Sequence, residues 1–237
     1  MRAHAALVVR RRGDRSVLTT MRSAPPLTLR RTGTAGETAR VHLVGTAAAP
    51  LGGDELRLDI DVGPDAALEL RSTGAQIALP HASGGPSTVH IGLNLAGSAV
   101  LHQEPTVLAR GSLVHNNASA QLTHDARLVW RDLVVLGRHG EEPGRMVQRW
   151  NVTRAGRPVL RTTTTLVDPL LYRSPAIIGG ATVLGTALVV SPGLTTESRV
   201  IGHRAAVHAL SGAALVTVLG EDAVEVEHAL TELTPTG

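Results

Sequence analysis

Two segments of the chain alternate strictly between apolar and polar residues. Every second residue of LRLDIDV (56–62) is apolar, and VHIGLNL (89–95) repeats the pattern. A period of two is typical of a β-strand that buries one face and turns the other toward water or a partner. We therefore predict a strand in each segment.

A similar turn follows at three places along the chain. The segments VGPDAALEL (62–70), LAGSAVLHQ (95–103) and LTHDARLVW (122–130) share an apolar residue, a turn pair, Asp or Ser, Ala, a variable residue and Leu. The polar side chain can accept a backbone N–H in the turn, and Ala leaves room for close packing. Spacings of 33 and 27 residues indicate a repeating pair of strands. The predicted fold is all-β with a few helices, in a stacked, β-helix-like or solenoid-like arrangement of two sheets.

The remaining segments carry weaker patterns. Residues 199–220 fit a helix in their first half, whereas their second half fits a strand equally well, and residues 176–190 fit a buried helix or two short strands. Three segments rich in Gly, Pro and Ser are predicted loops, namely 82–88, 140–145 and 191–198. No change of composition resembles a linker, so residues 1–237 are interpreted as one domain.

Composition narrows the classes of partner. The chain has no Phe, one Tyr and two Trp, so Leu, Val and Ala must fill the core. All 23 basic residues are Arg, yet the net charge is only +3. The only dense cluster is Arg10, Arg11, Arg12 and Arg15, which we interpret as a solvated hairpin end, so nucleic-acid binding is not expected. The absence of Cys excludes disulfides, thiolate nucleophiles, iron–sulfur clusters and cysteine-type zinc sites.

Targeting and membrane signals are also missing from the pattern. The N-terminal apolar run AHAALVV precedes its charges, whereas a secretory signal has its charges first. The longest nearly uncharged stretch, residues 176–190, is too short to span a bilayer. A soluble, cytoplasmic protein without a membrane partner is expected.

Candidate chemistry is confined to nitrogen and oxygen ligands in the middle third. No phosphate-binding loop, GxSxG or HExxH is present. His102 and Glu104 are two positions apart and would share one face of a strand, and Asp132, His139 and Glu141 follow. Such a set suits a divalent transition metal. We expect no permanently bound cofactor and only transient metal contact. A cupin-like metal-dependent oxygenase or isomerase is the enzyme alternative, although its HxH signature is replaced by HQE.

The stretch LGRHGEEPGR (136–145) concentrates one imidazole, two carboxylates and two guanidinium groups between glycines. Taken alone, it resembles a small catalytic or metal-binding loop. No nucleophile or cofactor motif accompanies it. We interpret it as a connection between a strand that ends near Leu136 and another that starts near Met146, in contact with a partner or a transiently held ion.

The middle of the chain resembles the family of urease accessory proteins called UreD, or UreH in some species. The resemblance covers residues 42–190 and is weaker before Val41 and after Ser191. It is carried by LGGDELRLDIDVGPDAALELRSTGAQ (51–76), VLHQEPTVLARGSLVH (100–115), WRDLVVLGRHGEEPGRMVQRWNVTRAGRPVLRTTTTL (130–166) and DPLLYRSPAIIGGATVLGTALV (168–189).

The resemblance implies a role without catalysis. Family members bind apo-urease in a complex with UreF and the GTPase UreG, and they help nickel to reach the urease active site. The implied fold is a β-rich stack with an internal polar tunnel. On this view His102, Glu104, Asp132, His139 and Glu141 are candidates for a transient nickel path. A third hypothesis is a β-solenoid interaction module unrelated to urease.

Overall fold

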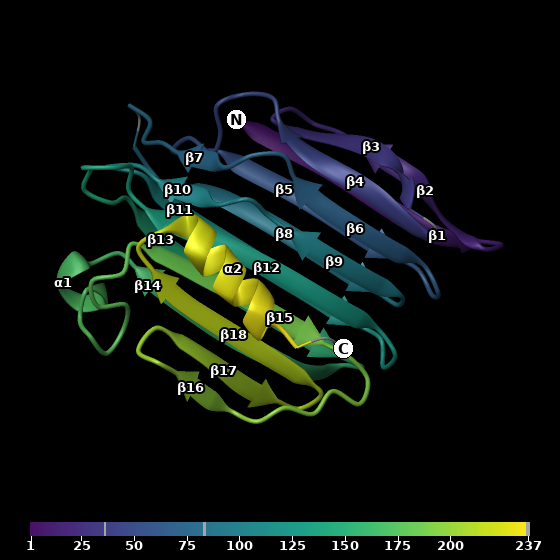
Figure 1. Ribbon diagram of the computed structural model, residues 1–237. Helices are drawn as coiled ribbons and strands as arrows, with labels where there is room; N and C mark the ends of the chain where they lie inside the picture. Colours follow the sequence, from purple (N-terminus) through teal and green to yellow (C-terminus); the bar gives the residue numbers. More distant parts are fainter. Residues whose placement is uncertain (36, 83, 236–237) are drawn as a thin grey trace.

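In the described part of the chain, eighteen strands build two stacked sheets, and two short helices lie outside them (Figure 1). This computed structural model describes residues 1–35, 37–82 and 84–235. It confirms the predicted all-β, solenoid-like arrangement of two sheets. The principal hydrophobic core lies between the sheets and consists mainly of Leu, Val and Ala, as the composition requires.

Sheet A has seven strands, and its five central strands run parallel. The antiparallel strands β2 and β14 form its two edges. In spatial order the strands are β14 (Arg157–Leu166), β13 (Arg145–Arg154), β11 (Leu113–Leu122), β8 (Ser87–Leu95), β5 (Glu55–Val62), β1 (Arg2–Arg12) and β2 (Arg15–Arg22).

Sheet B continues antiparallel at both ends of a parallel centre. In spatial order its strands are β16 (Arg199–Ile201), β17 (Ala205–Leu210), β18 (Ala213–Gly220), β15 (Val183–Val190), β12 (Arg127–Leu136), β9 (Ser98–His102), β6 (Ala67–Ser72), β4 (Thr38–Gly45) and β3 (Leu27–Ala35). The short strands β7 (Gln76–Ala78) and β10 (Thr106–Leu108) extend it beside β12.

The repeated turns connect the two sheets. The chain passes from β5 to β6, from β8 to β9 and from β11 to β12, each time through one of the three similar turns. Asp65 has a positive φ of 56° in the first turn. In the second, a Cβ on Gly97 would collide with the carbonyl oxygen of Ala66, so only glycine allows this close stacking of successive turns.

Two of the ambiguous segments are resolved as strands. Residues 199–220 form β16, β17 and β18, so the helix in the first half is wrong. Residues 176–190 form a series of turns and then the single strand β15, so neither a buried helix nor two strands is correct. Seven of the eight residues of β15 are buried, because one face contacts the core between the sheets and the other lies under a helix. Burial on both faces removes the alternation that identifies a strand.

That helix, α2 (Ala223–Leu233), has no counterpart among the elements predicted above and lies across the outer face of sheet B (Figure 1). The Asp222 carboxylate caps its N-terminus by accepting from the amides of Val224 and Glu225. Val226 and Leu230 are buried and form a second core with β15, β17 and β18. The other helix, α1 (Pro169–Tyr172), follows β14. Neither of these helices, nor any other in the described ranges, has the length and apolar character to cross a membrane.

Candidate functional site

The loop between β12 and β13 uses its charged groups to hold its own shape. Leu136 ends β12 and Arg145 begins β13, as predicted for a strand connection. Arg138 forms two parallel hydrogen bonds with Glu141, with Nε–Oε2 and Nη2–Oε1 distances of 2.8 Å. These bonds lower the pKa of Glu141 to about 2. Glu142 pairs with Arg173, at 3.3 Å, while His139 lies exposed in the same loop.

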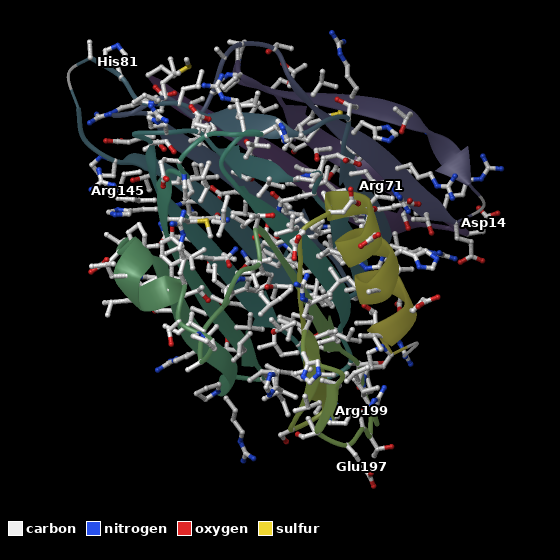
Figure 2. The ribbon with its side chains drawn as sticks, turned by 60° about the vertical axis from the view of Figure 1, so that its left-hand side comes forward. Asp14, Arg71, His81, Arg145, Glu197 and Arg199 are labelled. Carbon is white, nitrogen blue, oxygen red and sulfur yellow. The ribbon has the colours of Figure 1, made fainter. Side chains whose placement is uncertain are left out.

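His102 links sheet B to α2. Its Nε2 lies 3.0 Å from Glu227 Oε1, and its Nδ1 lies 3.4 Å from Arg71 Nη1. Figure 2 shows Arg71 beside α2. Burial lowers the pKa of His102, the Glu227 carboxylate opposes that shift, and Arg71 and Arg131 add to it. A neutral ring that donates from Nε2 and accepts at Nδ1 satisfies both contacts. His102 therefore holds α2 against β9.

Glu104 lies outside the strand that contains His102. β9 ends at His102, so the two side chains do not share a strand face, because residues 103–105 form an irregular connection to β10. The Glu104 amide donates to Ser72 Oγ at 2.6 Å. Glu104 lines a cavity of about 360 Å³ together with apolar Leu27, Leu43 and Ile77. Within the described ranges its carboxylate makes no hydrogen bond or ion pair.

Asp132 is buried between the sheets. It lies on β12 and accepts a hydrogen bond from Gln148 Nε2 of β13 in the opposite sheet. Burial raises the pKa of Asp132 to about 6, and the bond from Gln148 limits that rise. This pair separates two apolar clusters. Trp130 belongs to the principal core on one side, and Val134 belongs to a smaller cluster on the other side.

Polar atoms continue on the side of the principal core. Trp130 and Trp150 lie with ring centroids 5.0 Å apart and ring planes tilted by 59°. In the described part of the chain, both indole nitrogens are buried without a hydrogen-bond partner. The interior therefore contains a short polar strip made of Trp130, Asp132, Gln148 and Trp150.

The five candidate residues do not converge. His102 and Glu104 lie at the end of β9, Asp132 lies between the sheets, and His139 and Glu141 lie in an exposed loop. Among the described residues, no group of three or more His, Asp or Glu side chains could hold a metal ion. Reasoning from the sequence missed Gln148 and Glu227, because their partners are 16 and 125 residues away and no local motif links them.

Comparison with known proteins gives a consistent result. The family model described as UreD urease accessory protein matches residues 1–235, so the match extends well beyond residues 42–190. A urease accessory protein UreD from Parafrankia sp. (strain EAN1pec) is 36% identical over 260 residues, covering 98% of this chain and 88% of the relative. The one from Streptomyces avermitilis is 39% identical, covering 87% and 85%. Urease accessory protein UreD 1 from Saccharopolyspora erythraea is 38% identical, covering 98% and 94%.

Proposed function

The chain belongs to the UreD family of urease accessory proteins, and we propose that it is a scaffold on which urease receives its nickel. It would bind apo-urease together with UreF and UreG in the cytoplasm and assist the insertion of nickel. The family is a non-catalytic one, so the oxygenase or isomerase hypothesis is wrong. The hypothesis of a solenoid module unrelated to urease is excluded by the same membership.

The observation that carries the proposal is the extent of the family match. It runs from residue 1 to residue 235 and so includes both sheets and both helices. Because the match covers the whole fold, the function of the family is the first hypothesis to test for this chain. Fold alone would not justify this step, since unrelated functions recur on one architecture.

Nickel is the cargo in this proposal, and single contacts suit a cargo better than a closed site. An ion passes along a path only if each contact is weak enough to release it. Glu104 lines a cavity and lies close enough to His102 to affect its pKa, and Asp132 offers a buried carboxyl whose pKa of about 6 lies near neutral pH. Neither belongs to a group of three or more possible metal ligands among the described residues, which supports transient handling rather than retention.

Co-purification tests the proposed complex. The chain would carry an affinity tag and be expressed together with UreF, UreG and the structural subunits of urease from one organism. The expected result is a complex that contains all of these proteins in fixed proportions. Recovery of the chain alone, from cells in which the untagged partners are soluble and abundant, would contradict the proposal.

Neutral substitutions test the proposed nickel path. The triple variant Glu104→Gln, Asp132→Asn and Glu141→Gln removes three carboxylates with little change in volume. We expect it to co-purify with the same partners but to leave roughly tenfold less nickel in urease purified from the same cells, because carboxylate oxygen is lost at each contact. Unchanged nickel content would refute the role of these residues.

A matched control removes the same number of negative charges from the surface. Asp14, Asp125 and Glu197 are exposed and distant from the candidates, and Figure 2 shows Asp14 and Glu197 at the periphery of the molecule. The triple variant Asp14→Asn, Asp125→Asn and Glu197→Gln should leave nickel delivery as it is in the wild type. An equal loss in this control would assign the effect to net charge.

A further inference from the structure

β14 is the longest of the strands that form sheet edges in the described part of the chain. It has ten residues, against eight in β2, nine in β3 and three in β16. One side of β14 pairs with β13. On its other side, no backbone group of residues 157–166 makes a hydrogen bond within the described part of the chain. The edge strand β2, by comparison, makes one such backbone hydrogen bond, because the Ser16 amide donates to the carbonyl oxygen of Glu37.

The second half of the free edge of β14 lacks the features that usually prevent pairing. Natural edge strands carry charges, proline or a bulge where a foreign strand would add. In β14 the proline is Pro158, and the irregular register lies opposite Val152 and Thr153, both near the turn to β13. The remainder, from Thr162 to Leu166, is regular and uncharged. Such a segment can accept a further strand through its backbone.

Charge defines which strand would fit. The hairpin of β13 and β14 contains five arginines and no Asp or Glu. Four of the five are exposed and form no ion pair within the described ranges, whereas Arg154 donates to the carbonyl oxygen of His124. These four are Arg145, Arg149, Arg157 and Arg161.

The arginines gather on the outer face of sheet A. Arg149 lies opposite Thr163, and Arg161 lies opposite Asn151, the next outward position on β13. Figure 2 shows Arg145 on the side of the molecule where α1 lies. A second copy of this chain, paired edge to edge, would bring arginine against arginine. An acidic segment would instead neutralise them.

The far end of the same edge is apolar. β14 ends at Leu166, and α1 follows and contacts it. Leu170 and Leu171 of α1 are 89% and 65% exposed, among the most exposed large apolar side chains described. A strand that adds to β14 would thus meet Arg149 and Arg161 along its middle and an apolar contact near α1.

We propose that the outer edge of β14 is a docking surface for an extended acidic segment of a partner protein. The segment adds to sheet A as its next strand, with backbone hydrogen bonds to β14. Its outward side chains are Asp or Glu that face Arg149 and Arg161, and an apolar residue at one end contacts Leu170 and Leu171. This surface shares no residue with the nickel path proposed above, so either proposal can fail without the other.

A synthetic peptide tests the docking surface. The probe is a soluble, fluorescent ten-residue peptide that alternates Glu with Thr or Val and ends in Leu. We expect saturable binding by fluorescence anisotropy, together with slower amide hydrogen exchange in residues 161–166. A peptide with Lys in place of Glu should not bind. A peptide N-methylated at alternate residues, which cannot pair along one edge, should also fail.

Charge reversal locates the binding on the protein. Arg149→Glu with Arg161→Glu should weaken peptide binding by roughly tenfold or more. Arg30→Glu with Arg31→Glu on β3 changes the net charge equally, alters exposed residues at the opposite end of the molecule, and should leave binding unchanged. Circular dichroism confirms that each variant is folded.

Three results would overturn the proposal. The first is equal binding of the N-methylated peptide, which would remove the role of backbone pairing. The second is equal weakening by the β3 variant, which would reduce the effect to net charge. The third is tighter binding of a ten-nucleotide polyuridylate that displaces the peptide, which would make the arginines a nucleic-acid surface instead.

Discussion

Asp132 is the residue whose position the sequence explains least. It is one of eight buried polar or charged residues described, and it lies between two apolar clusters on the inner face of β12. A carboxyl group in this environment costs free energy when it ionises, and a single amide donor compensates only part of that cost. Burial of Asp132 lowers the stability of the fold at neutral pH, so stability does not explain why a carboxyl group lies there.

Neutralising Asp132 should stabilise the protein at neutral pH. The folded-state pKa is raised from 3.8 to about 6, so the folded state holds its proton over a range where the unfolded chain has lost it. This contribution to stability is complete below about pH 4 and is lost as the pH rises through 6. We expect Asp132→Asn to exceed the wild type by up to about 3 kcal/mol in free energy of unfolding at pH 7, and to match it near pH 4.

Urea unfolding at pH 4.5, 6 and 7 measures this difference. Asn retains an oxygen that can accept from Gln148 Nε2, so the packing around residue 132 changes little. Parallel pH dependence of wild type and variant between 4.5 and 7 would show that folding does not raise the pKa of Asp132.

At the residue scale, the local sequence identifies candidate chemical groups, but it does not predict which residues surround them in the fold. Reasoning from LGRHGEEPGR identified a strand connection correctly, because glycines and flanking strands are local features. The local sequence does not show that Arg138 and Glu141 pair with each other, which leaves Glu141 less available to a metal ion. The spacing of His102 and Glu104 suggested one strand face, and it failed because β9 ends at His102. Where a strand ends is decided by pairing with β6 and β12.

At the element scale, the packing of α2 depends on two glycines of sheet B, Gly185 and Gly220, which form a small socket for Val226. A Cβ on Gly220 would lie too close to Val226 Cγ2, and one on Gly185 would lie 2.7 Å from Val226 Cγ1. Both glycines belong to strands under the helix, β18 and β15. Since Val226 is β-branched and held in a regular helix, it has little freedom to move away.

A double-mutant cycle tests this socket. Gly220→Ala should cost about 1–3 kcal/mol by overpacking. Val226→Ala should remove the clash at the expense of a small cavity. The combined variant should therefore be more stable than the sum of the single changes predicts, by about 0.5–3 kcal/mol. Free energies from urea unfolding give the cycle, and strictly additive costs would show that the two residues do not interact.

The element scale also shows which patterns can be interpreted without the structure. β5 and β8 follow strict alternation because one face of each contacts the core and the other faces water. β15 lacks this pattern because it is covered on both faces. The signals of α2 were present: Asp222 at the cap and Glu225 in the first turn. The stronger strand pattern of the preceding residues masks these two signals.

At the scale of the whole molecule, the solenoid was predictable because its unit is local. Each turn from sheet A to sheet B is encoded by a few neighbouring residues, and the three similar turns repeat along the chain. The sheet order was not predictable. β1 pairs in parallel with β5, more than fifty residues away, and no local pattern specifies such a partner.

The central claim is that this chain assists the maturation of urease, and nickel content tests it most directly. Urease would be purified from cells that express its structural subunits, UreF and UreG, with or without this chain. The nickel bound per active site would be measured by mass spectrometry and the specific activity recorded alongside. We predict urease that is largely nickel-free without the chain and nickel-loaded and active with it. The same low nickel content in both preparations, when a UreD from a relative restores loading in those cells, would contradict the account.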